Sequence, residues 1–158
     1  MLCVYYSRTG NTRRAMEEIA QALGAELAEL QDSVDRSGWG GWLRCGMDAM
    51  RRTVPAVKCP ARFPLTDYRL VIVGSPVWAG RCSSPVRSFL VEYGNELRQV
   101  AYVITRSSDL RYEEVFDQMD LYVPTPRASA VTIRPNTVGS TFWRDEFLTS
   151  IRGDGKED

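Results

Sequence analysis

The six residues Ser7-Arg8-Thr9-Gly10-Asn11-Thr12, SRTGNT, stand between a short apolar run and an amphipathic segment. The run before them, Leu2 to Tyr6, is apolar, β-branched and aromatic, which is typical of a buried strand. The segment after them ends at Gly24 and repeats apolar residues at helical spacing, at Met16, Ile19, Ala20 and Leu23. The pattern predicts a strand that turns through mostly small polar residues and enters a helix.

A turn of this kind is suited to bind an anion. It exposes backbone N–H groups at the positive end of the helix dipole. Ser7, Thr9 and Thr12 add hydroxyl donors, and Gly10 lets the backbone approach a ligand closely. The same composition is also typical of a simple helix cap, so these residues alone leave phosphate binding and capping as two open alternatives. The stretch matches neither GxxxxGK[ST] nor GxGxxG, so the nucleotide motifs based on those patterns are absent.

A second stretch, Val71 to Gly80, reads VIVGSPVWAG: an apolar run followed by a loop of Pro76, Val77, Trp78, Ala79 and Gly80. SRTGNT resembles the T/S-x-T-G-x-T loop with which flavodoxins hold the phosphate of flavin mononucleotide (FMN). VIVGSPVWAG resembles the third strand and the first flavin loop of the same family, and the two motifs stand in the family's order and spacing. The resemblance implies FMN as the cofactor, with one FMN per chain.

Strand and helix patterns alternate five times along the chain, which predicts an α/β fold with a parallel sheet and helices on both faces. The expected strands are Leu2–Tyr6, Ala25–Leu30, Leu70–Ser75, Val100–Thr105 and Ala128–Ile133. With the resemblance, this is a flavodoxin-like doubly wound, five-stranded parallel sheet of order 2-1-3-4-5. In such a sheet, ligands bind beyond the carboxyl ends of strands one and three, where the strand order reverses.

At 158 residues the chain suits one domain, 1–158, with an elaborated segment at about 32–67 and a frayed polar tail at about 153–158. Within the elaborated segment, a helix is expected from about Trp42, although several nearby glycines weaken that expectation. Trp39 and Trp42 either pack under their own loop or form a lid over the flavin.

The resemblance implies three loops at the flavin. The first holds the phosphate, and the second and third enclose the ring, with Trp78 stacked on it; the alternative for Trp78 is a plain core tryptophan. The third loop consists of Thr105, Arg106, Ser107, Ser108 and Asp109. Relatives often carry glycines there, and the departure leaves open a second interpretation, in which Ser108 or Asp109 caps the next helix, expected to begin near Tyr112.

Composition excludes several other classes. The 20 basic and 20 acidic residues cancel, so neither nucleic acid nor a membrane surface is an expected partner. Without a membrane-spanning run or a signal-peptide pattern, we expect a cytoplasmic protein. The chain has no histidine, and its four cysteines show no CxxC spacing, which argues against a metal site and a histidine-dependent triad. No residue is predicted to be a catalytic acid or base.

Three functions fit these observations. The first is an electron carrier that works through FMN, as flavodoxins do. The second is an FMN-dependent NAD(P)H oxidoreductase acting on a quinone or similar small acceptor, and the third is a non-redox module with the same fold. Arg8, Arg81 and Arg106 lie in or beside the three loops. They either ease reduction of the flavin or point to water without effect.

Overall fold

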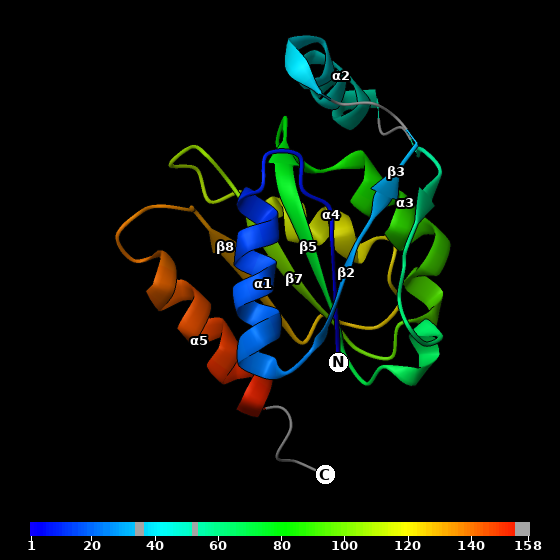
Figure 1. Ribbon diagram of the computed structural model, residues 1–158, viewed down its shortest axis with the longest axis vertical. Helices are drawn as coiled ribbons and strands as arrows, with labels where there is room; N and C mark the ends of the chain where they lie inside the picture. The colour runs from blue at the N-terminus through cyan, green and yellow to red at the C-terminus, as the bar shows by residue number, and fades with distance from the viewer. Residues whose placement is uncertain (34–36, 52–53, 154–158) are drawn as a thin grey trace.

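Five parallel strands form the centre of the molecule (Figure 1). A computed structural model describes residues 1–33, 37–51 and 54–153, so the tail predicted at 153–158 lies outside the described residues except for Gly153. The strands are β1 (Leu2–Tyr5), β2 (Glu26–Glu29), β5 (Val71–Trp78), β7 (Val100–Thr105) and β8 (Ser129–Ile133). Their order in the sheet is β2-β1-β5-β7-β8, which confirms the predicted arrangement.

Helices cover both faces of this sheet. On one face lie α1 (Asn11–Leu23) and α5 (Ser140–Gly153), and on the other lie α3 (Ser84–Tyr93) and α4 (Glu114–Asp120). Each face has its own apolar cluster, because successive residues of the buried strands point to opposite sides. α3 begins at Ser84, with Ser83 as its N-cap residue and Pro85 in its first turn, where the missing N–H of proline is tolerated.

The loop predicted at residues 76–80 is instead a hairpin. β5 continues to Trp78 and pairs in antiparallel fashion with a further short strand, β6 (Arg81–Cys82). The two residues between them, Ala79 and Gly80, have φ of +47° and +71°. Positive φ at both central positions is characteristic of the type I′ turn, whose twist matches that of the flanking strands. The main sheet therefore has this sixth strand beside the five that were predicted.

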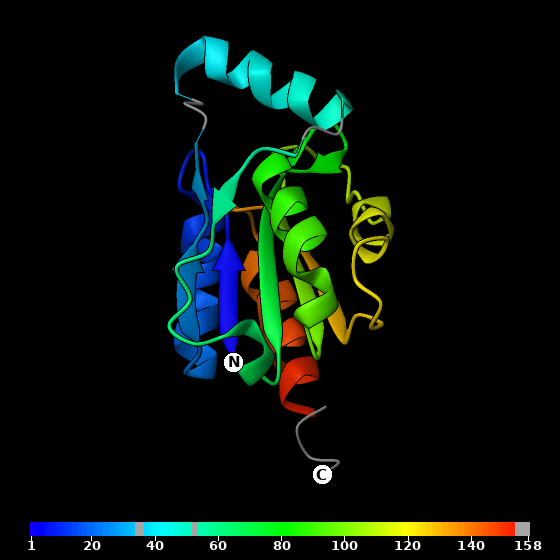
Figure 2. The same cartoon turned by 90° about the vertical axis from the view of Figure 1, so that its right-hand side faces the viewer.

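The elaborated segment forms a small sheet and a helix. β3 (Gln31–Asp32) pairs with β4 (Val57–Lys58), and a 3₁₀ turn at Leu65–Asp67 leads the chain back to β5. α2 (Gly38–Arg51) begins earlier than expected and lies across the carboxyl ends of the strands (Figure 2). Its buried positions are the small residues Gly41, Cys45 and Ala49. No helix in the described part of the chain is long and apolar enough to cross a bilayer.

Candidate functional site

A cavity of about 490 Å³ lies at the carboxyl ends of the central strands, and residues of α2 line it as well. Residues from all three predicted loops line it. These are Arg8, Thr9, Asn11, Thr12, Pro76, Val77, Trp78, Ala79, Thr105, Arg106 and Ser107. Its volume lies within the range of about 300–1,000 Å³ that is common for small-molecule and cofactor sites. The structure therefore brings three segments that are distant in the sequence to one place.

The first loop is shaped by Ser7 and Gly10, which do not line the cavity themselves. Gly10 precedes α1 with a φ of +90°, and its N–H donates to Ser7 Oγ at 3.1 Å. A Cβ at Gly10 would meet no atom within 4 Å, so the backbone conformation, not a lack of space, favours glycine here. Thr12 is buried and its hydroxyl lies 2.7 Å from that of Thr105, which joins the first loop to the third.

In the second loop, Trp78 is both a cavity wall and a packed side chain. It is 9% exposed, and the ring of Tyr6 meets it edge-on with the centroids 5.6 Å apart. The turn after it is held from α4, where Gln118 Nε2 donates to the carbonyl oxygen of Gly80 at 3.3 Å. Gly80 lies outside the cavity lining. Trp78 thus packs against the core and also lines the cavity, and its stacking on the flavin ring stays a prediction.

The third loop divides in the middle. Thr105, Arg106 and Ser107 line the cavity, whereas Ser108 and Asp109 do not. The Arg106 guanidinium donates to the carbonyl oxygen of Ser108, and Asp109 pairs with Arg134. The capping interpretation is wrong, because α4 begins only at Glu114, with Glu113 as the residue before it.

The charge at the cavity is positive. Arg8 and Arg106 line it, and among the described residues no aspartate or glutamate does. Arg81, the third arginine of interest, lies in β6 outside the lining. No cluster of metal-ligating side chains was found in the part of the chain that is described. The polar side of the cavity therefore suits an anion held at the start of α1.

The opposite wall of the cavity comes from α2. Its lining residues are Trp42, Leu43, Cys45, Gly46, Met47 and Met50. The sequence predicted a helix from about Trp42 and offered a lid over the flavin as one alternative for Trp39 and Trp42. Trp42 lines the cavity and Trp39 does not, and Leu43, Met47 and Met50 were not placed at the site. Pro135, after β8, also lines the cavity and was missed. The signal that could have revealed the wall is a helix whose large apolar side chains follow one face while its small residues follow another.

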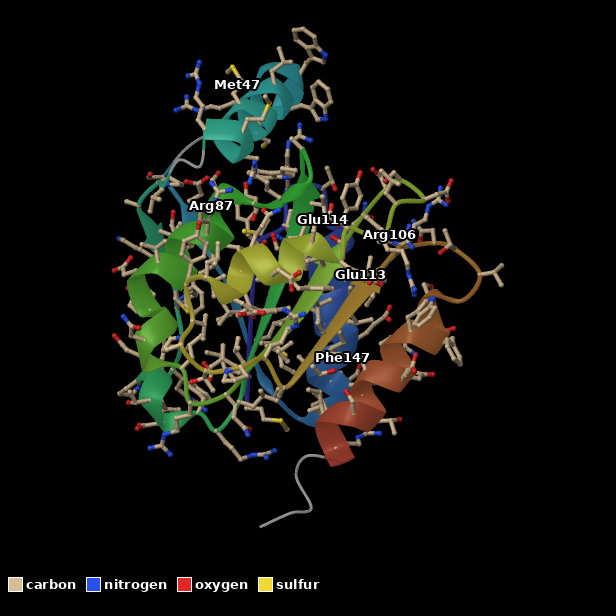
Figure 3. The ribbon with its side chains drawn as sticks, turned by 180° about the vertical axis from the view of Figure 1, so that it is seen from behind. Met47, Arg87, Arg106, Glu113, Glu114 and Phe147 are labelled. Carbon is tan, nitrogen blue, oxygen red and sulfur yellow. The ribbon has the colours of Figure 1, made fainter. Side chains whose placement is uncertain are left out.

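Both ends of α2 are anchored to neighbouring elements. At its start, Arg8 Nη2 donates to the carbonyl oxygen of Gly38 at 2.8 Å. Near its end, Arg87 of α3 is only 3% exposed and its guanidinium reaches the carbonyl oxygens of Asp48 and Ala49, each at 3.5 Å. Figure 3 shows Arg87 at the end of α3 that faces α2, below Met47. A cation at the carbonyl end of a helix is also favourable to the helix dipole.

Beneath this contact lies Cys82, whose carbonyl oxygen accepts from Arg87 Nη2 at 3.3 Å. Burial raises the pKa of the Cys82 thiol to about 11, and the charge of Arg87 opposes that rise. The thiol is therefore neutral at physiological pH.

Comparison with solved structures supports the same architecture. A flavoprotein from Lactobacillus acidophilus NCFM, solved in complex with FMN, is 21% identical with a TM-score of 0.67 and covers 90% of this chain and 96% of its own. A flavoprotein from Bacteroides eggerthii is 18% identical with a TM-score of 0.71, covering 92% and 96%. Oxidised flavodoxin 2 from Bacillus cereus is 17% identical with a TM-score of 0.59, covering 97% and 98%.

At these identities the likeness establishes the fold, which is flavodoxin-like. No family model matches the sequence, and no curated protein matches it significantly.

Proposed function

We propose that this chain binds FMN and works as a redox protein that transfers electrons through the flavin. The observation that carries the proposal is the meeting of three loops around one cavity at the switch point of a flavodoxin-like sheet. The Lactobacillus acidophilus protein of similar fold was solved with FMN, which supports the choice of cofactor. When bound, FMN supplies the electron chemistry, and the protein supplies position and electrostatics.

The residues present fit the two ends of FMN. The first loop offers the N-terminus of α1, the hydroxyls of Thr9 and Thr12, and the positive charge of Arg8, which suit a terminal phosphate. In the proposal, residues 7–12 hold the phosphate, Trp78 stacks on the ring system, and residues 76–80 and 105–109 enclose its edges. Ser7, Gly10, Gly80, Ser108 and Asp109 act by shaping these loops.

The proposal treats residues 1–158 as one domain and the protein as cytoplasmic. The free state of all four cysteines supports a reducing compartment.

The test is titration of the purified protein with FMN and FAD. We expect one FMN per chain, weaker binding of FAD because the first loop is suited to a terminal phosphate, and loss of FMN binding in Gly10→Val. Gly139→Val is the matched control, because Gly139 has a similar φ of +93° but lies directly before α5, outside the three loops. FMN binding that is equally tight in the parent and in Gly10→Val would refute the assignment of the first loop.

A second measurement tests the ring position. The fluorescence of bound FMN should be strongly quenched in the parent and partly restored in Trp78→Ala. Quenching that does not change in this variant would assign the stacking role to another aromatic side chain, such as Tyr112 or Trp42.

A further inference from the structure

We infer that β8, the strand at one edge of the sheet, pairs with β8 of a second copy of this chain. The pairing is antiparallel about a two-fold axis, and it joins the sheets of the two copies into one. The groove along β8 shares no lining residue with the cavity proposed for FMN. The inference therefore goes beyond the proposed function and does not depend on it.

The first observation is the difference between the two edges of the sheet, β2 and β8. Beside β2, the Glu26 carboxylate accepts from the N–H of Arg62 and from the hydroxyl of Tyr68, each at 2.6 Å, so the segment before β5 is held at that edge. Among the described strands, β8 pairs only with β7. A groove of about 520 Å³ lies along it and is lined from both α4 and α5. Figure 3 shows these two helices on either side of β8.

The second observation is which backbone groups of β8 face the open edge. The N–H of Arg106 donates to the carbonyl oxygen of Ile133 at 3.1 Å, so the backbone of Ile133 faces β7. Successive residues of a strand point their backbone groups to opposite sides, so Ala130 and Thr132 face outward. In a two-fold antiparallel pair centred on Val131, Ala130 of one copy lies opposite Thr132 of the other. Each then exchanges both of its backbone hydrogen bonds with the residue opposite.

The third observation is the charge of the residues that line the groove from the α4 side, because each end has one cation and one anion. At the carboxyl end of β8, the Arg111 carbonyl oxygen accepts from the Thr132 hydroxyl at 2.9 Å, and the Arg111 guanidinium lies 3.7 Å from the Glu113 carboxylate. At the amino end, Arg127 lies 3.2 Å from Asp117. Antiparallel pairing places these two ends opposite each other, so each cation meets an anion of the second copy. A surface that contacts itself about a two-fold axis needs this self-complementary arrangement.

Arg111 also makes the pairing selective. Its guanidinium lies over the Trp143 ring, 4.3 Å from the ring centre, and a charged side chain at an edge strand opposes pairing with unrelated strands. The Arg111 side chain is 48% exposed, so it is free to turn toward Asp117 of the second copy. Leu110 and Leu121, which flank the two ends of the groove, are 66% and 77% exposed and also meet in this arrangement.

The decisive experiment is sedimentation equilibrium of the purified full chain over a range of concentrations. We expect a reversible dimer that dissociates in the micromolar range, because a short strand pair buries a small interface. Ala130→Pro removes an outward N–H but leaves the pairing with β7, and it should weaken the dimer about tenfold or more.

Leu27→Pro is the matched control at the opposite edge of the sheet. The N–H groups of Glu26 and Leu30 donate to β1 and the residues that flank it, so the N–H of Leu27 faces outward from β2. This variant should leave the dissociation constant of the dimer within about twofold of the parent value, because the two edges are distant from each other.

A charge exchange tests the antiparallel arrangement with exposed side chains that the fold does not need. Arg111→Glu and Asp117→Arg should each weaken the dimer about tenfold or more, because each places like charges opposite one another. The variant with both substitutions restores opposite charges and should recover the dimer to within about threefold of the parent. Circular dichroism of every variant checks that the fold is retained.

Three results would overturn the inference. The first is a parent that stays monomeric over the whole concentration range. The second is equal weakening of the dimer in Ala130→Pro and Leu27→Pro, which would place the contact elsewhere on the molecule. The third is a double charge variant as weak as the single ones, which would show that β8 does not pair with itself and would leave the groove to a strand of another protein.

Discussion

α1 and α2 begin in the same way but have different roles in the structure. They are 13 and 14 residues long, and a glycine with positive φ stands at the start of each, Gly10 before α1 and Gly38 as the first residue of α2. α1 turns its large apolar side chains, such as Met16, into the core between helix and sheet. α2 buries only small residues and presents its large ones, such as Met47, to the cavity. The difference shows that an amphipathic helix can be held by its small face and by polar anchors, which leaves its apolar face available for a ligand.

The largest expected effect comes from the same substitution made in both helices. Met16→Ala removes a fully buried side chain and should lower the free energy of unfolding by about 2–5 kcal/mol. Met47→Ala removes a half-exposed side chain and should change it by no more than about 0.5 kcal/mol. Urea unfolding of the two variants beside the parent measures both values. A comparable loss in both variants would mean that the apolar face of α2 belongs to the core.

The pH dependence of stability tests whether solvent reaches the Cys82 thiol under α2. Burial raises the pKa of Cys82 from an ordinary 9.0 to about 11. Because the folded state resists ionisation, the stabilisation is complete below pH 9 and is lost as the pH rises toward 11. Two pKa units correspond to about 3 kcal/mol. The parent should therefore lose stability relative to Cys82→Ala between pH 9 and 11. Parallel pH profiles of the two proteins would show that solvent reaches the thiol.

Removal of the Arg87 side chain should make local opening of α2 easier and leave the stability of α1 unchanged. Arg87→Met withdraws a buried guanidinium from the carbonyl oxygens of Asp48, Ala49 and Cys82. Hydrogen bonds to a charged group contribute roughly 1.5–3 kcal/mol, so a loss of about 2 kcal/mol is expected. Amide hydrogen exchange should become faster across α2, with little change in α1. Uniform acceleration in both helices would assign Arg87 a global role.

The smallest effect concerns the charge at the proposed flavin site. Arg106 lines the cavity and Arg81 does not. Arg106→Gln should lower the midpoint potential of bound FMN by about 30 mV, which is roughly 1.4 kcal/mol for a two-electron couple. Arg81→Gln should lower it much less, because solvent and salt screen a half-buried charge outside the site. A redox titration at low salt distinguishes the two, and equal shifts would show that distance from the cavity does not matter.

The sheet and the turn before α1 could be predicted because their signals are local. The strand expected at Val100–Thr105 has the same bounds in the structure, since a strand covered on both faces is an uninterrupted apolar run. The order of the strands followed from the alternation of strand and helix patterns together with the resemblance.

The hairpin and the position of α2 could not be predicted, because neither has a clear local signal. Ala79 adopts a positive φ that alanine rarely takes, so the residues after Trp78 did not indicate a hairpin turn. α2 is held by Arg8 and Arg87 through backbone carbonyls, which any residue provides. Contacts of this kind leave no pattern in the residues that accept them, and the wall of the cavity was missed for that reason.

The hydrogen bond from Arg8 to the carbonyl oxygen of Gly38 links the first loop to the start of α2. An anion bound in the first loop would share this guanidinium with the start of α2, so the occupancy of one would change the free energy of the other. Thermodynamic reciprocity would then make the two effects equal: the factor by which the anion changes the hold on α2 is the factor by which α2 changes the hold on the anion. Arg8 thus makes the loop and the helix two sites of one coupled equilibrium.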